Sequence, residues 1–212
     1  MVFPDIELEK RLWKKGFKYV VGIDEAGRGP LAGPVCAGAV LIDESSQLHP
    51  FVRDSKMMTE KRREDVFEYI KENCIAYGIG MIDSVVIDEL GIQEAVKMAM
   101  EEALRQVEKK IKSRVDYLIV DGTNVSIISG YHMRKIKAGD LKHYSISAAS
   151  ILAKVTRDRF MRDIAKEYPV YCFEKHVGYG TKLHMENLLK YGPCSIHRRS
   201  FAPIKRLIIK SL

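Results

Sequence analysis

The stretch Val20-Val21-Gly22-Ile23-Asp24-Glu25 joins an apolar strand to two adjacent carboxylates. Apolar and β-branched residues in a short run are typical of a buried strand. A lone aspartate at a strand end is more often a turn or helix cap. Burying ionised carboxylates is costly unless a cation or another partner compensates their charge. Acidic residues elsewhere in the chain therefore matter, because together with this pair they could bind a cation.

Further elements extend outward from this strand. Apolar runs predict strands at residues 19–23, 35–42, 75–82 and 117–120. Apolar positions spaced by three and four, together with capping residues, predict helices from Thr59 to about Cys74, over 92–112, from Ser147 to Lys166, and a last one from Thr181 to about Gly192. This order predicts an α/β fold with a mixed central sheet, in which an early antiparallel meander is followed by strands that arrive through helical crossovers.

The bulk composition predicts one globular domain. A chain of 212 residues can enclose a full hydrophobic core, and 46% hydrophobic with 30% charged residues excludes disordered and fibrous classes. We expect a single domain over 1–212, with a core at about 19–166 and a C-terminal helical and loop extension at 167–212 that crosses the face of the domain and binds substrate. The net charge of +7 favours polyanionic partners such as nucleic acid.

Targeting signals are missing from the sequence. No apolar run reaches membrane-spanning length, and the N-terminus lacks the apolar core of a signal peptide, so we expect a cytoplasmic protein without membrane association. The four cysteines are widely spread with no C-x-x-C pair, which predicts reduced thiols and no zinc site.

Two further aspartates can join the acidic pair. Asp121 also ends an apolar strand, and Asp140 lies in a polar loop before the Ser147 helix. A cluster of carboxylates at one end of a sheet repels itself unless hard cations neutralise it, and Mg²⁺ or Mn²⁺ prefers oxygen ligands. Two such ions match the arrangement that activates water in phosphodiester hydrolysis.

The segment after the acidic pair, Ala26-Gly27-Arg28-Gly29-Pro30-Leu31-Ala32-Gly33-Pro34, is rich in glycine. Its third glycine comes one place late for G-x-G-x-x-G, and the chain has no G-x-x-x-x-G-K-[ST], which argues against dinucleotide and P-loop chemistry. Glycines here allow a ligand to approach the backbone closely.

The residues Gly22-Ile23-Asp24-Glu25-Ala26-Gly27-Arg28-Gly29-Pro30 closely resemble the signature of the ribonuclease HII family. Further blocks resemble that family in the same order, over about Val20 to Pro203: Asp54-Ser55-Lys56, Val120-Asp121-Gly122, Gly139-Asp140, residues 147–159, Gly178-Tyr179-Gly180-Thr181 and residues 197–201. The resemblance implies a ribonuclease H-like fold and hydrolysis of the RNA strand of RNA/DNA hybrids. It also implies incision on the 5′ side of single ribonucleotides embedded in duplex DNA.

The resemblance also implies roles for individual residues. Asp24, Glu25, Asp121 and Asp140 would be the catalytic residues that bind two divalent ions, Mg²⁺ or Mn²⁺. The backbone of Gly27, Arg28 and Gly29 would contact the ribose 2′-hydroxyl that distinguishes RNA from DNA, and Tyr179 would stack on the following sugar. Lys56, Ser147 and Ser150 are expected phosphate contacts, although solvation and capping explain them nearly as well.

Other polar residues receive structural interpretations. Asp158 is interpreted as structural because Arg157 and Arg159 flank it. The spacing of His176, His184 and His197 fits no zinc pattern, so these are expected to be structural or at the substrate edge. Val177 departs from the family, which commonly has a basic residue there, so a phosphate contact is in doubt. Ribonuclease HIII is disfavoured, because it carries an added N-terminal domain and a different pattern after its acidic pair.

Two other readings remain open from the sequence. Another two-metal phosphodiesterase of the same fold, such as a structure-selective DNA nuclease, would share the carboxylates but not need the Gly-Arg-Gly loop. A nucleic-acid-binding module without catalysis would fit the charge but not the acidic set. The C-terminal 204–212 alternates basic and apolar residues without a partner-docking motif, so we expect a monomer with no sliding-clamp or other protein partner.

Overall fold

The computed structural model describes residues 3–52 and 58–210. Its strands form one mixed sheet in the order β3-β2-β1-β4-β5. The bounds are β1 Val20–Ala26, β2 Val35–Leu41, β3 Ala76–Ile82, β4 Tyr117–Asp121 and β5 His132–Ile136. The first three strands pair antiparallel, whereas β4 lies parallel to β1 and β5 parallel to β4. The predicted mixed sheet is confirmed, and β5 is an additional strand.

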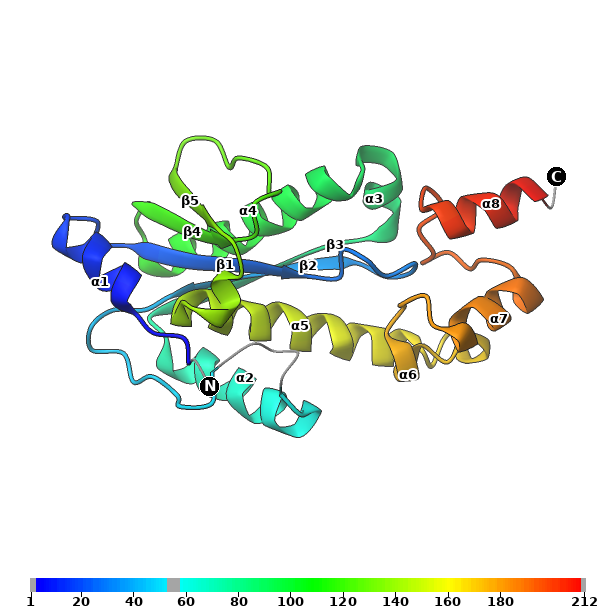
Figure 1. Cartoon of the computed structure of the whole chain (residues 1–212), viewed down its shortest axis with the longest axis horizontal. Coiled ribbons are helices and arrows are strands. Elements are labelled where there is room, and N and C mark those ends of the chain that lie inside the picture. Colours follow the sequence, from blue (N-terminus) through cyan, green and yellow to red (C-terminus); the bar gives the residue numbers. More distant parts are fainter. Residues whose placement is uncertain (1–2, 53–57, 211–212) are drawn as a thin grey trace.

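Helices cover both faces of this sheet (Figure 1). On one face α4 (Ile92–Ile111) follows α3 (Ser84–Leu90), and on the other α5 (Tyr144–Ile164) packs beside α2 (Glu60–Asn73). The close approach of α5 requires glycine on β2, since a Cβ at Gly38 would lie 2.3 Å from the carbonyl oxygen of Ala149. The apolar stripe of α4 is buried as predicted, and Thr59 caps α2 by accepting from the amide of Arg62.

The start of α5 differs from the prediction. The helix begins at Tyr144, so Ser147 lies inside its first turns and is not the cap. A distant segment satisfies part of the helix start: the buried Glu9 accepts from the amide and the hydroxyl of Ser145, at 3.3 and 2.7 Å. Glu9 lies on α1 (Glu7–Lys14), a helix that the sequence did not predict. A cap supplied by a distant segment leaves no local signal.

The C-terminal extension contains the short 3-10 turn η3 (Pro169–Tyr171) and the helices α6 (Phe173–His176), α7 (Lys182–Tyr191) and α8 (Ala202–Lys210). Thr181 caps α7 as predicted, but α8 follows, so α7 is not the last helix. We expected the extension to cross the face of the domain, and the structure places it elsewhere. It packs at the end of the sheet where β1 finishes, coloured orange and red in Figure 1, and contacts the Gly-rich loop at residues 27–34.

All four cysteines are free thiols, as predicted. Across residues 3–52 and 58–210, no helix combines the length and the apolar character needed to span a bilayer.

Candidate active site

Neighbouring parallel strands bring Asp24 and Asp121 to the same end of the sheet. The register pairs Ile23 of β1 with Val120 of β4, so the next residue on each strand is an aspartate. Paired residues of adjacent strands project from the same face. Here they project toward α5, where the hydroxyl of Ser150 donates to the Asp24 carboxylate.

Asp140 reaches these two carboxylates from the 3-10 turn η2 (Gly139–Leu141). The turn is fastened to β4 because the amide of Gly139 donates to Oδ1 of Asp121 over 2.6 Å. Asp24, Asp121 and Asp140 each offer a carboxylate oxygen, and these oxygens all lie within 4.8 Å of one another. Asp24 and Asp140 are buried, with 5% and 7% of their surface exposed.

Glu25 borders the same cleft but is oriented differently. It follows Asp24 on β1 and therefore projects from the opposite face of the strand. Its Oε1 forms an ion pair with Arg28 at 2.9 Å. Its Oε2 is buried and has no hydrogen-bond partner among the residues that the structure describes. The structure thus gathers three of the four predicted carboxylates and leaves the fourth beside them with an unsatisfied oxygen.

This concentration of negative charge changes the acidity of the carboxyl groups. Burial raises the pKa of Asp24 well above its usual range, and the charges of Glu25 and Asp121 raise it further. Burial also raises the pKa of Glu25, against the opposing effect of Arg28. Buried, mutually repelling oxygens, including the unsatisfied Oε2 of Glu25, form a donor set suited to hard divalent cations. The residues present therefore fit a divalent metal site.

The carboxylates open into a cleft of about 530 Å³. Its lining residues are Asp24, Glu25, Ala26, Gly27, Arg28, Gly29, Arg63, Asp121, Ser150, Lys154 and Tyr179. Most of them were predicted, although Arg63 and Lys154 were not. Their sequence signals are weak but present: Arg63 ends a Lys-Arg-Arg run behind Thr59, and Lys154 belongs to the block at 147–159. Both add positive charge next to the acidic cluster.

The Gly-rich loop and Tyr179 face each other across this cleft. A Cβ built on Gly29 would lie 3.9 Å from Cε1 of Tyr179, and Tyr179 is 43% exposed. Gly27 adopts φ +94°, and a Cβ there would lie 2.2 Å from Nε of Arg157. The first glycine is therefore required by its backbone and packing, whereas Gly29 keeps open the space beside the aromatic ring.

Among the described residues, Ser147, Asp158 and Val177 do not line the cleft. Ser147 is fully buried in α5, so it cannot reach a phosphate, because the helix begins before it. Lys56 lies outside the described residues. Asp158 accepts from Lys154 at 2.9 Å, and its structural interpretation stays a prediction. Val177 is half-buried and packs in an apolar cluster, so this position supplies no cationic contact.

The three histidines of the extension lie in the protein interior. His176, His184 and His197 are buried, with 7%, 0% and 1% of their surface exposed, and none of them lines the cleft. Their rings pack against Phe173 at centroid separations of 5.5–5.9 Å.

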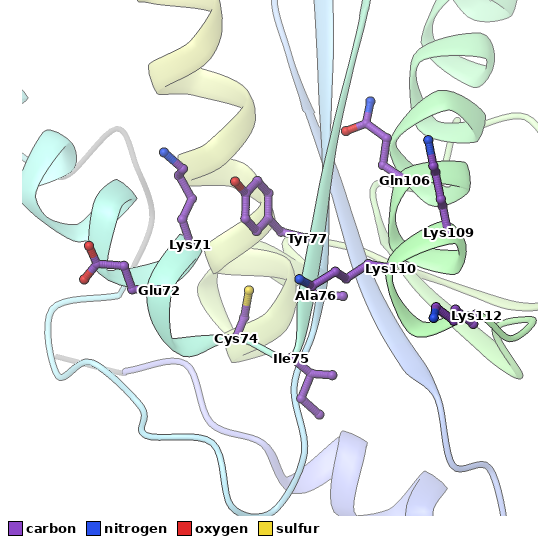
Figure 2. Close-up of a pocket in the computed structure, with 10 residues that line it drawn as sticks. All are labelled: Lys71, Glu72, Cys74, Ile75, Ala76, Tyr77, Gln106, Lys109, Lys110 and Lys112. Atoms are coloured by element: carbon purple, nitrogen blue, oxygen red, sulfur yellow. The ribbon is translucent and has the colours of Figure 1, made fainter.

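A larger hollow, of about 950 Å³, lies at the other end of the sheet (Figure 2). It begins where β3 starts, at Ala76, which pairs with Leu41 at the end of β2. Its lining residues are Lys71, Glu72, Cys74, Ile75, Ala76, Tyr77, Gln106, Lys109, Lys110 and Lys112. A single carboxylate among four lysines does not suit a divalent cation. Chemistry, not size, therefore identifies the smaller cleft as the candidate active site.

Comparisons with known proteins show the family of this chain. The family model described as Ribonuclease HII matches residues 21–204. Ribonuclease HII of Caldicellulosiruptor bescii is 50% identical over 195 residues, covering 92% of each chain, and ribonuclease HII of Bacillus subtilis is 45% identical over 93% of this chain and 74% of its own. The crystal structure of ribonuclease H2 from Pyrococcus horikoshii superposes with a TM-score of 0.73 at 26% identity, covering 91% of this chain and 98% of that one. The chain therefore belongs to the ribonuclease HII family, nucleases that hydrolyse the RNA of RNA/DNA hybrids.

Proposed function

We propose that, besides cutting RNA/DNA hybrids, this chain incises duplex DNA on the 5′ side of a single embedded ribonucleotide. The observation that carries the proposal is the juxtaposition within one cleft of the acidic cluster, the Gly27–Gly29 backbone and the Tyr179 ring. A backbone amide or carbonyl approached this closely can contact a 2′-hydroxyl, and an exposed aromatic ring can stack on the neighbouring sugar. Together they would recognise one ribonucleotide and its 3′ neighbour.

Asp24, Glu25, Asp121 and Asp140 are proposed to hold two divalent ions, Mg²⁺ or Mn²⁺. Such ions, when bound, supply an activated water and stabilise charge on the leaving oxygen. The chain's own residues hold the carboxylates in place: the Ser150 hydroxyl and the Glu25 amide both donate to Asp24, the latter over 2.8 Å. We expect a 3′-hydroxyl and a 5′-phosphate as products.

Positive charge around the cleft would hold the phosphate backbone. Lys154 is directed at the cleft with 21% of its side chain exposed, and Arg28 with 30% exposed, and both are held by carboxylates of this chain. Ser150 remains a proposed substrate contact, although its hydroxyl is already engaged by Asp24. We also propose that the chain acts as a cytoplasmic monomer without a protein partner.

The test compares one embedded ribonucleotide, a full RNA/DNA hybrid and all-DNA duplex, each with and without Mg²⁺ or Mn²⁺. The proposal expects metal-dependent cleavage of the first two and none of the third. Stacking is worth about 1–3 kcal/mol, so Tyr179→Ala should slow cleavage at the single ribonucleotide about tenfold and affect the hybrid less. Tyr179→Phe keeps the ring and is the matched control. Equal slowing of both substrates by Tyr179→Ala would show that the ring supports the fold instead.

Cleavage of the all-DNA duplex would instead support a structure-selective DNA nuclease. Binding of the duplex without any metal-stimulated cleavage would support a binding module. Both alternatives share the charge of this chain, but neither requires the Tyr179 ring beside Gly29.

A further inference from the structure

Two consecutive residues of the C-terminal extension, His197 and Arg198, are buried beside the Gly-rich loop. They are 1% and 0% exposed, and neither lines the cleft. Arg198 nevertheless forms hydrogen bonds to the Gly-rich loop, and His197 is linked through His184 to the backbone of Tyr179. Neither residue therefore touches substrate, but both fix the backbone that would.

Arg198 holds the Gly-rich loop through its backbone carbonyls. Its Nη2 donates to Gly27 and Pro34 at 2.6 and 3.0 Å, its Nη1 to Arg28 at 2.9 Å and its Nε to Gly33 at 2.9 Å. These four hydrogen bonds offset the cost of burying the cation. The planar fork of a guanidinium reaches these carbonyls together, whereas a lysine ammonium is a point donor.

His197 holds Tyr179 through a second histidine. The amide of Cys194 donates to Nδ1 of His197 at 2.9 Å, which leaves the proton on Nε2. Nε2 of His197 then donates to Nε2 of His184 at 3.0 Å, and Nδ1 of His184 donates to the carbonyl of Tyr179 at 2.9 Å. The direction of every bond is fixed, and both rings must be neutral. Burial, with His184 nearby, lowers the pKa of His197 to about 4, consistent with a neutral ring.

The turn that carries Tyr179 needs such support. Val177 and Gly178 adopt φ values of 44° and 87°. The left-handed region is unfavourable for a β-branched residue, so external contacts must hold this conformation. The amide of Leu31 donates to Gly178 and the amide of Arg198 donates to Leu31, each at 2.8 Å, which ties the turn, the loop and residue 198 together.

We propose that His197 and Arg198 are positioning residues that set the spacing between the Gly27–Gly29 backbone and the Tyr179 ring, and with it the selectivity for a single ribonucleotide. This inference rests on the proposed function, in which that loop and that ring recognise the ribonucleotide. His184 and His197 would thus influence selectivity although neither of them lines the cleft.

A matched pair of substitutions tests the His197 link. Gln places an amide nitrogen near the position of Nε2 and can still donate to His184, whereas Asn reaches only the position of Nδ1. We expect His197→Asn to lower the ratio of kcat/KM for the embedded ribonucleotide over that for the hybrid by about tenfold, the scale of one lost stacking contact. His197→Gln should restore most of the ratio. Arg198→Lys should lower it as well, whereas Arg105→Lys, an exposed arginine paired with Glu102, should leave it unchanged.

A double-mutant cycle separates positioning from general support of the fold. All variants are assayed at a temperature where circular dichroism shows them folded. If His197 acts through Tyr179, His197→Asn should have little further effect in a Tyr179→Ala background. The proposal is overturned if His197→Asn has its full effect in that background, if His197→Gln is as defective as His197→Asn, or if both substrates slow by one factor. Should Arg198→Lys fail to fold, the His197 pair still gives the result.

The same design distinguishes this inference from the proposed function. Wild-type protein that cuts the hybrid but not the embedded ribonucleotide would refute the proposed function. The cycle between residues 197 and 179 can then be measured on the hybrid alone, where full additivity would refute the positioning role independently.

Discussion

A matched pair of glycine substitutions in one loop, Gly27→Ala and Gly29→Ala, should separate folding from recognition. Both add a single methyl group, and both positions line the candidate active site. The surroundings of the two methyl groups differ. At Gly27 the methyl would lie 2.2 and 2.4 Å from Nε and Cδ of Arg157 and 2.8 Å from the carbonyl oxygen of Pro34, on a backbone with φ +94°. At Gly29 the nearest atom is Cε1 of Tyr179, at 3.9 Å.

The expected cost at Gly27 has two parts. Alanine in this backbone region costs about 1–3 kcal/mol. The methyl also displaces Arg157, which is 1% exposed and donates to Pro34, Val177 and Ala32 at 2.9, 3.0 and 3.1 Å. Disrupting a bond of a buried charged group adds at least about 1–3 kcal/mol. The sum of about 2–6 kcal/mol is a large share of a typical free energy of unfolding of about 5–15 kcal/mol.

The expected cost at Gly29 is small. Its backbone is outside the left-handed region and the contact at 3.9 Å is an ordinary van der Waals distance, so a surface-type change within about 0.5 kcal/mol is expected. For a chain of this size 1 kcal/mol corresponds to about 2–4 °C in Tm. Gly27→Ala should therefore lower Tm by roughly 4–24 °C, and Gly29→Ala by less than about 2 °C.

Thermal unfolding by circular dichroism and cleavage assays on both ribonucleotide substrates measure the two effects. Gly29→Ala should be folded but defective, with the larger loss at the single ribonucleotide, because its methyl fills the space beside the Tyr179 ring. Equal Tm losses for the two variants would refute the packing argument. A Gly29→Ala protein that cuts both substrates at wild-type rates would refute the assignment of this loop to ribose recognition.

Three further predictions concern the acidic cluster and the extension. Asp121→Asn should reduce cleavage by orders of magnitude while duplex affinity, measured by fluorescence anisotropy, stays close to wild type, because the cationic phosphate contacts remain; near-normal turnover in saturating Mg²⁺ would remove Asp121 from the metal site. In chelator, Asp24→Asn should melt several degrees higher than wild type, because Asn removes the repulsion from Glu25 and Asp121 that raises the pKa of Asp24. Two fully ionised carboxylates 4.8 Å apart repel by about 3.5 kcal/mol at an effective dielectric constant of 20, and protonation of Asp24 reduces this figure. Added metal should shrink or reverse the difference in Tm, and a lower Tm without metal would contradict the repulsion. The pKa of His197 in the folded chain, about 4, lies below the usual 6.5, so between these pH values the unfolded chain binds more protons. The free energy of unfolding should therefore decline by up to about 3 kcal/mol as the pH falls from 6.5 toward 4. Urea unfolding of His197→Gln should show a flatter dependence on pH.

Local sequence was sufficient for the elements whose signals lie within a few residues. The apolar strand before Asp24, the stripe of α4 and the caps Thr59 and Thr181 were all predicted and are confirmed. The resemblance to ribonuclease HII named the residues of the candidate site, and most of them line one cleft. Strand β5 was missed because it is a largely exposed edge strand without an apolar run.

Tertiary structure decided what depends on residues far apart in the chain. At the start of α5, Ser145 donates to Glu9 across a sequence separation of 136 residues. The helix begins before Ser147, which lies in the core and not at the expected phosphate contact. The strand register and the turn at Asp140 gather three carboxylates, while the alternation along β1 turns Glu25 toward Arg28. The sequence placed acidic residues, glycines and an aromatic ring in the right order, because motifs and periodicity are local. The distances among them depend on hydrogen bonds such as those from Arg198 to residues 27 and 28, which form only when the C-terminal extension packs against the loop.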